Sequence, residues 1–366
     1  MNVADMAVIG LIVSIFPPEL VDSAVEDVGS KEVRRRALPA RLVTYFVIAM
    51  AVWPQLGYVG VLEKLATALR WTRAAVPPFI KIPSDGSIAK ARARLGDEAL
   101  HRLFELSPEQ AGAPSGSDGP VRAGRRICSL TGALLALPDT FDNRHAFDVP
   151  PDQEVPQGRL LMLGDNASRA VLGAAFEGAG TEQSGMVRSL LGRTPGPLLV
   201  LVDPDLPAAD LLHEIRSAGA DAAWRLAASE VWTPLSILAD GSCLAVLGDG
   251  AGQPPLRVVE FSSASEGGAS PVTHRLATTV VDPDVLPAQE LVRAHLERFR
   301  TETVFQLLTR SRPDLRSPFR SRSPELVRQE LWGMLCCYQA LRLLVVAPIA
   351  GGTAGHGEET FPAKCS

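Results

Sequence analysis

An aspartate stands directly after a short apolar run. Asp203 follows five consecutive aliphatic residues, Leu198–Val202, and Pro197 and Pro204 flank this unit. Such a run predicts a strand buried on both faces, in the centre of a sheet that helices cover. Open α/β sheets place their chemistry at the carboxyl ends of their strands, which makes Asp203 a candidate site residue. The simpler alternative is that Asp203 caps the helix expected at Leu206–Ala218.

A second group of polar residues occurs at helical spacing later in the chain. His295, Arg298 and Glu302 lie at positions i, i+3 and i+7 of the segment Leu291–Arg310, so one face of a helix would carry all three. From Arg293 to Arg328 the sequence has nine arginines and four acidic residues. This local excess is compatible with a phosphate-binding face. The alternative is an ordinary solvated helix that is rich in arginine.

The composition is that of an ordinary globular protein. The 366 residues suffice for two or three domains, and 46% hydrophobic and 21% charged residues exclude the disordered and fibrous classes. With a net charge of −5, the whole chain is no polycation. The five cysteines follow no metal-ligand spacing, so we expect free thiols in a reducing, intracellular setting.

Two apolar stretches near the amino terminus lack the features of export or membrane segments. Ala7–Phe16 has neither a preceding positive charge nor a cleavage site, and prolines follow it directly. Leu42–Trp53 is too short to cross a bilayer. The sequence therefore predicts no membrane segment.

Residues 1–106 are expected to form a helical domain. One of its helices, Ile88–Leu95, carries Lys90, Arg92 and Arg94, and a glycine separates it from the next helix, Glu98–Leu106. Two short helices joined at a glycine, one of them basic, are typical of a helix-turn-helix-like DNA-binding unit. The other expected helices are Pro18–Val28, Leu38–Val52 and Gly60–Trp71.

A linker that is rich in Ser, Gly and Pro, residues 107–123, separates this region from a second domain at 124–348. There the order strand–strand–strand–helix–strand–helix–strand predicts an α/β fold with a mixed sheet of the ribonuclease H type. Residues 231–281 change to short β runs and indicate a β-rich insertion. A long helix is expected to begin at Pro287 and to carry Glu302, and another is expected at Pro324–Val346. The last residues, 349–366, are expected to be a disordered tail.

Three longer motifs resemble insertion element 4 transposases. Two of them correspond to the N-terminal domain of that family, and the third follows its catalytic domain. The resemblance extends from Phe16 to Leu344. The motifs are Phe16-Pro-Pro-Glu-Leu-Val-Asp22, Leu38-Pro-Ala-Arg-Leu-Val-Thr-Tyr-Phe46 and Ser323-Pro-Glu-Leu-Val-Arg-Gln-Glu-Leu-Trp-Gly333.

The resemblance implies a DDE transposase with a ribonuclease H-like domain, in which two aspartates and one glutamate hold two Mg²⁺ ions for phosphodiester cleavage and strand transfer. Hard cations prefer oxygen ligands, and two of them can stabilise the attacking and the leaving oxygen. Asp203 matches the second aspartate, and Glu302 matches the glutamate of the pattern tyrosine-x2-arginine-x3-glutamate-x6-lysine. Arg298 matches the arginine of that pattern, and Asp203 and Glu302 are the expected metal ligands.

The sequence departs from this family pattern at several positions. Thr131, in Ser129–Ala133, stands where the family has its first aspartate. His295 replaces the tyrosine of the glutamate pattern, and Thr309 replaces its lysine. A neutral hydroxyl is a poor substitute for a carboxylate, so we expect severely weakened metal binding and impaired catalysis. Asp205, on the loop that follows Asp203, is the candidate substitute ligand.

The remaining polar candidates are weaker. Asp139 lies eight residues after Thr131, too far along an extended strand to share a metal with it, and it is more simply part of a turn or capping cluster. His145 and His213 have no partners at nucleophile or metal spacing. The glycines at 248, 250 and 252 precede prolines rather than a helix, so they do not form a phosphate-binding loop.

The sequence thus predicts a DNA transposase of an insertion element that is catalytically impaired. The alternative is a non-catalytic DNA-binding protein derived from a transposase. The expected partner is double-stranded DNA at the element ends, with a homodimer left open and no membrane, in the bacterial cytoplasm at the nucleoid. The residues expected to contact DNA are Lys90, Arg92, Arg94, Arg298, Arg300 and Arg310.

Overall fold

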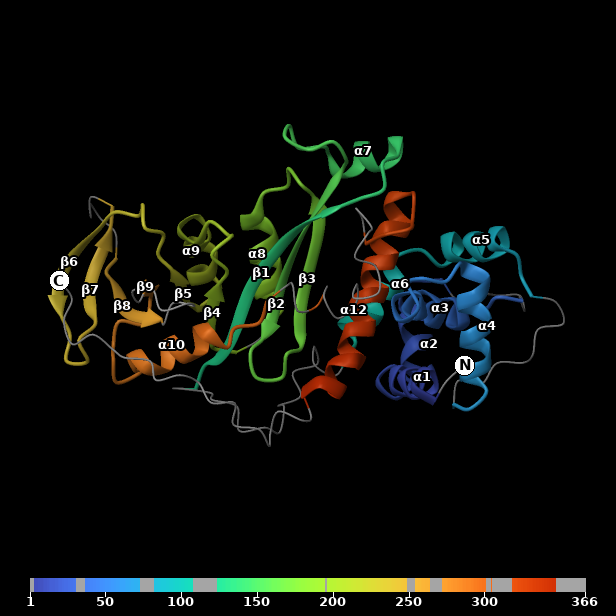
Figure 1. The fold of residues 1–366 in the computed structure, drawn as a ribbon, viewed down its shortest axis with the longest axis horizontal. Helices are drawn as coiled ribbons and strands as arrows, with labels where there is room; N and C mark the ends of the chain where they lie inside the picture. The colour runs from blue at the N-terminus through green and yellow to red at the C-terminus, as the bar shows by residue number, and fades with distance from the viewer. Residues whose placement is uncertain are drawn as a thin grey trace.

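The computed structural model contains a bundle of helices at one side and a long mixed sheet at the other, with one long helix between them (Figure 1). The fold class is therefore mixed α/β. The structure describes residues 3–30, 37–72, 82–107, 124–194, 196–248, 254–263, 272–300, 304 and 318–346.

The first six helices follow the patterns in the sequence. Pro18 occupies the first position of its helix, where a missing N–H costs no hydrogen bond. The Ser84 hydroxyl caps another helix by accepting from the amide of Ser87 at 3.4 Å. Gly96 ends that helix with a φ of 74°, a conformation that favours glycine. The helices are α1 (Val3–Ile15), α2 (Pro18–Asp27), α3 (Ala40–Val52), α4 (Tyr58–Leu69), α5 (Asp85–Leu95) and α6 (Glu98–Glu105).

A single sheet of nine strands forms the other half, in the order β3-β2-β1-β4-β5-β9-β8-β7-β6. Strand β4 is fully buried and lies between β1 and β5, parallel to both, which confirms the predicted central strand. The expected insertion at 231–281 forms β6 to β9, which extend this same sheet. The strands are β1 (Arg126–Ala136), β2 (Gln157–Asp165), β3 (Val171–Gly178), β4 (Leu198–Val202), β5 (Asp221–Arg225), β6 (Trp232–Ile237), β7 (Cys243–Leu247), β8 (Leu256–Ser263) and β9 (Val272–Thr278).

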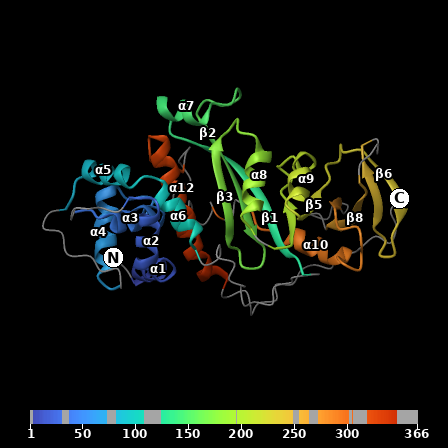
Figure 2. The same cartoon turned by 180° about the vertical axis from the view of Figure 1, so that it is seen from behind.

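Helices cover both faces of the sheet (Figures 1 and 2). One face, called here the α8 face, packs against α8 (Gln183–Gly192) and α9 (Ala208–Ser217) through alternate residues such as Val200 and Val202. The opposite face, called the α10 face, packs against α10 (Ala288–Leu296) through Leu199 and Leu201. A short helix, α7 (Phe141–Phe147), follows β1. Because strand residues alternate, each position on β4 has a defined face.

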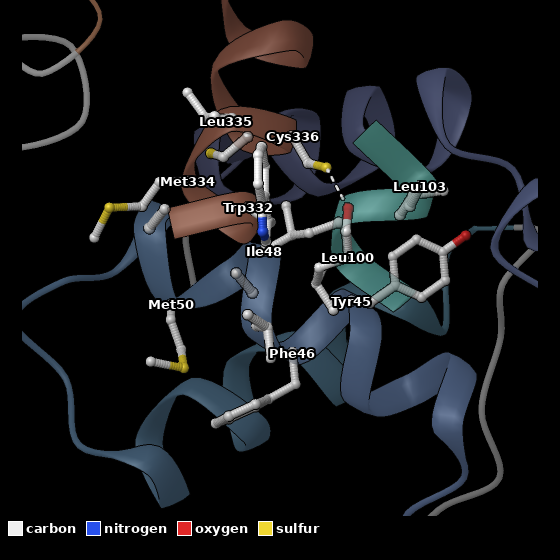
Figure 3. Close-up of a cluster of buried hydrophobic side chains, with 14 of the residues drawn as sticks. Tyr45, Phe46, Ile48, Met50, Leu100, Leu103, Trp332, Met334, Leu335 and Cys336 are labelled. Atoms are coloured by element: carbon white, nitrogen blue, oxygen red, sulfur yellow. Dashed lines mark hydrogen bonds between the residues drawn. The ribbon is translucent and has the colours of Figure 1, made fainter. Parts of the chain in front are cut away.

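The helix between the bundle and the sheet is α12 (Pro324–Val346), and its predicted bounds are confirmed. It contributes Leu331, Trp332 and Leu335 to a core shared with α3 and α6 (Figure 3). At its crossing with α3, a Cβ on Gly333 would lie 2.7 Å from Val47 Cγ1, so only glycine permits this close approach. The amino-terminal helices therefore share their core with a segment from near the end of the chain.

Four cysteines of the described chain, Cys128, Cys243, Cys336 and Cys337, are free and buried, as the sequence predicts. Burial raises the pKa of Cys128 to about 12, so this thiol stays protonated. Among the described helices, none alone has the length and apolarity to span a bilayer; only the bent pair α1 and α2, at 56°, meets that criterion together.

Candidate functional site

Thr131 and Asp203 lie side by side at the carboxyl end of β4. Leu130 pairs with Val202, and the Asp203 amide continues the ladder by donating to the Leu130 carbonyl at 2.9 Å. The Thr131 hydroxyl donates to Asp203 Oδ2 at 3.2 Å. Thr131 is only 1% exposed, and Asp203 is half-buried. The structure thus brings together the two positions that the sequence placed in one site.

The loop after β4 is organised around the same carboxylate. Asp203 Oδ1 accepts a hydrogen bond from the backbone amide of Asp205 at 3.2 Å, which forms an Asx turn. The Asp203 carbonyl accepts from the amide of Leu206 at 3.0 Å. Helix α9 begins only at Ala208, so Asp203 shapes the loop and is no direct cap of the helix. Asp205 itself is exposed.

The helix that carries His295 is shorter than the sequence predicts. It ends at Leu296, and Arg298–Arg300 are not helical, so His295 and Arg298 do not continue one helical face. The physical reason is a competing set of hydrogen bonds. The Phe299 amide donates to Ser129 Oγ at 3.2 Å and to Asn166 Oδ1 at 3.3 Å. These bonds from the sheet replace those that a longer helix would have supplied.

Phe299 is inserted over the sheet directly after the helix ends. Its side chain is 1% exposed, and a Cβ placed on Gly164 of β2 would lie 2.3 Å from its ring. Asn166, just beyond β2, also donates to the carbonyl of Ala294 at 3.3 Å. A glycine and an asparagine at the end of β2 therefore fix the path of the chain after α10.

We expect Gly164→Ala to lower the free energy of unfolding by about 1–3 kcal/mol, because the added methyl overlaps a buried ring that has little room to move. Chemical denaturation measures this change. Phe299→Leu removes part of the ring, so the double variant should lose less stability than the sum of the two single variants. Strict additivity would contradict this packing.

Arg298 and His295 are in contact. Arg298 Nη1 donates to the His295 carbonyl at 3.1 Å and lies 3.4 Å from its ring Nε2. His295 is buried, and burial together with nearby arginines, Arg298 first among them, lowers its pKa to about 3. The imidazole is therefore neutral at physiological pH, unlike the guanidinium beside it.

The turn between β2 and β3 contains site residues that the sequence reasoning missed. Asp165 accepts from Ser168 Oγ at 2.6 Å and from Arg126 at 3.2 Å, and these bonds lower its pKa against the opposing effect of burial. Arg169 donates to the Glu297 carbonyl at 2.7 Å, and its own carbonyl accepts from the Tyr338 hydroxyl at 2.8 Å. The only sequence signal was a polar run between two apolar strands, which indicates a turn but gives no tertiary partner.

Arg92 requires a correction, because it cannot contact DNA in this structure. Its side chain is 0% exposed, and it donates to Gln329 Oε1 at 2.8 Å and to Ser321 Oγ at 2.9 Å. Lys90 and Arg94, by contrast, are exposed on α5, although Arg94 also donates to the Leu38 carbonyl at 2.8 Å.

The remaining residues that the sequence analysis discussed are Arg300, Glu302, Thr309, Arg310 and Asp139. Arg300 is exposed just beyond Phe299. Glu302, Thr309 and Arg310 lie outside the described residues. Asp139 pairs with Arg144 at 2.5 Å in the turn before α7.

The described part of the site does not fit the two-metal set that the resemblance implied. No group of three or more His, Cys, Asp or Glu side chains that could hold a metal occurs among the described residues. Thr131 supplies a hydroxyl where the set needs a carboxylate, and its proton is directed at an oxygen of Asp203. Mg²⁺ needs several oxygen ligands in near-octahedral geometry. Among the described side chains, Asp203 contributes one half-buried carboxylate at this point, and Asp205 on the same loop is exposed.

Residues 6–105 match the family described as insertion element 4 transposase N-terminal. Over 349 residues the chain is 24% identical to the transposase InsG for insertion sequence element IS4 of Escherichia coli (strain K12), a match that covers 90% of this chain and 75% of the relative. Among solved structures, a piggyBac transposase synaptic complex with hairpin DNA aligns over 94% of this chain and 76% of that chain, with 10% identity and a TM-score of 0.41. The two sequence matches support an insertion element 4-type transposase, with the N-terminal domain of that family at residues 6–105.

Proposed function

We propose that the chain binds DNA as an insertion-element transposase does, and that its cleavage and strand-transfer activity is impaired. The observation that carries the proposal is the hydrogen bond from Thr131 to Asp203 at the carboxyl end of β4. A hydroxyl there supplies neither the charge nor the two acceptor oxygens of a carboxylate. The DNA partner is inferred from the similarity to transposases over most of the chain.

The proposed domains are a helical N-terminal region at 1–106, a linker at 107–123 and a ribonuclease H-like region at 124–348. The strand order β3-β2-β1-β4-β5 supports this, with β1 to β3 antiparallel and β4 and β5 parallel to β1. The proposed place of action is the bacterial cytoplasm, where the chromosomal DNA lies.

A direct test incubates the purified protein and Mg²⁺ with DNA that carries the ends of its element. We expect a shifted DNA band at low salt and no cleaved or joined product. Cleavage that requires Mg²⁺ and disappears in Asp203→Ala would refute the proposal that catalysis is impaired. It would also point to Asp205 as the replacement ligand. The absence of any shifted band would refute DNA binding.

Lys90→Ala should reduce the salt dependence of DNA binding. If Lys90 contacts one phosphate, the slope of log K against log salt should decrease by about 0.9, measured between about 50 and 200 mM salt. Arg102→Ala is a matched control on the next helix, because Arg102 is already paired with Asp27 at 2.8 Å. Equal slopes for the Lys90 variant and the unmodified protein would remove Lys90 from the DNA interface.

The second candidate is a DNA-binding protein without any catalytic role, which occupies element ends. The burial of Thr131 favours it, because a 1% exposed hydroxyl that is bonded to Asp203 is a well-packed arrangement. If both the unmodified protein and a variant with a carboxylate at position 131 bind DNA and neither cuts it, this candidate is the better account.

A further inference from the structure

The sheet places an arginine directly beside Asp203. Val202 of β4 pairs with Trp224 of β5, so the next pair along this parallel register is Asp203 and Arg225. Neighbouring strands are about 4.8 Å apart. Ala223, two residues before Arg225, belongs to the core of the α10 face, and strand alternation puts the Arg225 side chain on that same face. Thr131, Asp203 and Arg225 therefore lie in one row across β1, β4 and β5.

Further basic residues surround this row. The ring of Phe261, on the α10 face of β8, lies 5.1 Å from the His274 ring and 6.4 Å from the His295 ring. His295 is at the end of α10, where Arg298 contacts it and Arg300 follows. The Phe299 amide, between Arg298 and Arg300, donates to Ser129 Oγ on β1 at 3.2 Å, two residues before Thr131, and this places both arginines near the row.

Electrostatic effects in the cluster agree with this geometry. Arg298, Arg225 and Arg300 each lower the pKa of His295, in addition to the larger effect of burial. Burial and Arg225 likewise lower the pKa of His274. The histidines are therefore mainly neutral, and the arginines carry the positive charge. The carboxylate of Glu260 does not offset it, because Glu260 pairs with Arg275 at 2.6 Å on the α8 face.

We propose that the α10 face beside Asp203 binds a DNA phosphate directly, through Arg225 together with Arg298 and Arg300, with no divalent cation between the protein and the phosphate. A guanidinium presents two parallel N–H groups to phosphate oxygens, which makes arginine a strong phosphate ligand. The Thr131 hydroxyl engages Asp203, and the described carboxylates here are too few to hold a cation. Fixed positive charge thus replaces a metal at the carboxyl ends of β4 and β5.

This inference rests on the proposed DNA-binding function. Fluorescence anisotropy with a fluorescein-labelled duplex of arbitrary sequence tests the role of Arg225 in binding. Arg225→Ala should weaken binding about tenfold and reduce the salt slope by about 0.9, as expected for the loss of one phosphate contact. Arg225→Lys keeps the charge and should lose less. Arg216→Ala is the matched control, because Arg216 lies at the far end of α9 on the α8 face. The affinity of this variant for the duplex should stay within about twofold of that of the unmodified protein.

The same titration in EDTA and in Mg²⁺ at equal ionic strength tests the role of the metal. We expect equal affinities in the two buffers. Binding that needs Mg²⁺ would overturn the direct contact, as would an Arg225→Ala variant that binds as tightly as Arg216→Ala. If the unmodified protein fails to bind any duplex at low salt, the proposed function fails together with this inference. If it binds and only the Arg225 comparison fails, the proposed function stands and this inference does not.

Discussion

Arg92→Ala should lower the free energy of unfolding by about 3 kcal/mol, because each buried acceptor that loses its donor costs about 1–3 kcal/mol. The Arg92 guanidinium donates to Gln329 Oε1 at 2.8 Å, to Ser321 Oγ at 2.9 Å and to the Leu326 carbonyl at 3.3 Å. It also donates to the Tyr58 hydroxyl at 2.6 Å. These acceptors belong to α4, to α12 and to the segment before α12. Denaturant unfolding measures the loss as a shift of the midpoint.

Two further variants show where this energy comes from. Arg92→Met keeps most of the side-chain volume and removes the donors, so a similar loss would assign the effect to hydrogen bonds rather than to packing. Lys90→Ala, two residues away on the exposed side of α5, should change the stability by no more than about 0.5 kcal/mol. An Arg92→Ala variant with unchanged stability and weakened DNA binding would contradict the structural role and restore the role that the sequence suggested.

The burial of Arg92 could have been predicted from the sequence. In an α-helix, residues two apart face different directions, so Lys90 and Arg94 can share a face but Arg92 cannot join them. The buried residues of α5 are Ile88, Ala91, Arg92 and Leu95, the i, i+3, i+4 and i+7 pattern of a core-facing stripe. The run of basic residues concealed this periodicity. What the sequence could not supply is the partner, since Gln329 lies on a helix 237 positions later.

Local patterns predicted β4 and α12 well. The apolar run of β4 is bounded by prolines, and that of α12 begins with a proline at the first helical position. Both elements are largely buried. The end of α10 was predicted wrongly, because it depends on Ser129 and Asn166 from the sheet. In the sequence, the helical spacing of polar residues continues through Arg298. In the structure, tertiary hydrogen bonds end the helix before that residue. Likewise, the position of Arg225 beside Asp203 follows from strand register, which a single sequence does not determine.

Thr131→Asp should have the largest effect on chemistry of any single change in this chain. The new carboxylate would lie next to Asp203, where the threonine hydroxyl is 3.2 Å from Oδ2 in the unmodified protein. Two carboxylates so close repel each other, so without a cation we expect the free energy of unfolding to decrease by about 1–2 kcal/mol. Mg²⁺ should restore this stability, because a ligand that binds only the folded state stabilises it. The unmodified protein should show no comparable response to Mg²⁺.

Thr131→Asn is the control that distinguishes the effect of the negative charge from the effect of side-chain size, because asparagine is neutral and close in size to aspartate. It should show neither the loss of stability in EDTA nor the recovery in Mg²⁺. On DNA that carries the element ends, Thr131→Asp should give weak cleavage that depends on Mg²⁺, and the unmodified protein and Thr131→Asn should give none. His295 and Thr309 also depart from the family pattern, so we expect recovery to stay far from complete. A thermal unfolding midpoint of Thr131→Asp that is the same in EDTA and in Mg²⁺ would show that Asp203 does not share a cation with position 131. In that case the missing first carboxylate could not be the reason for the loss of catalysis.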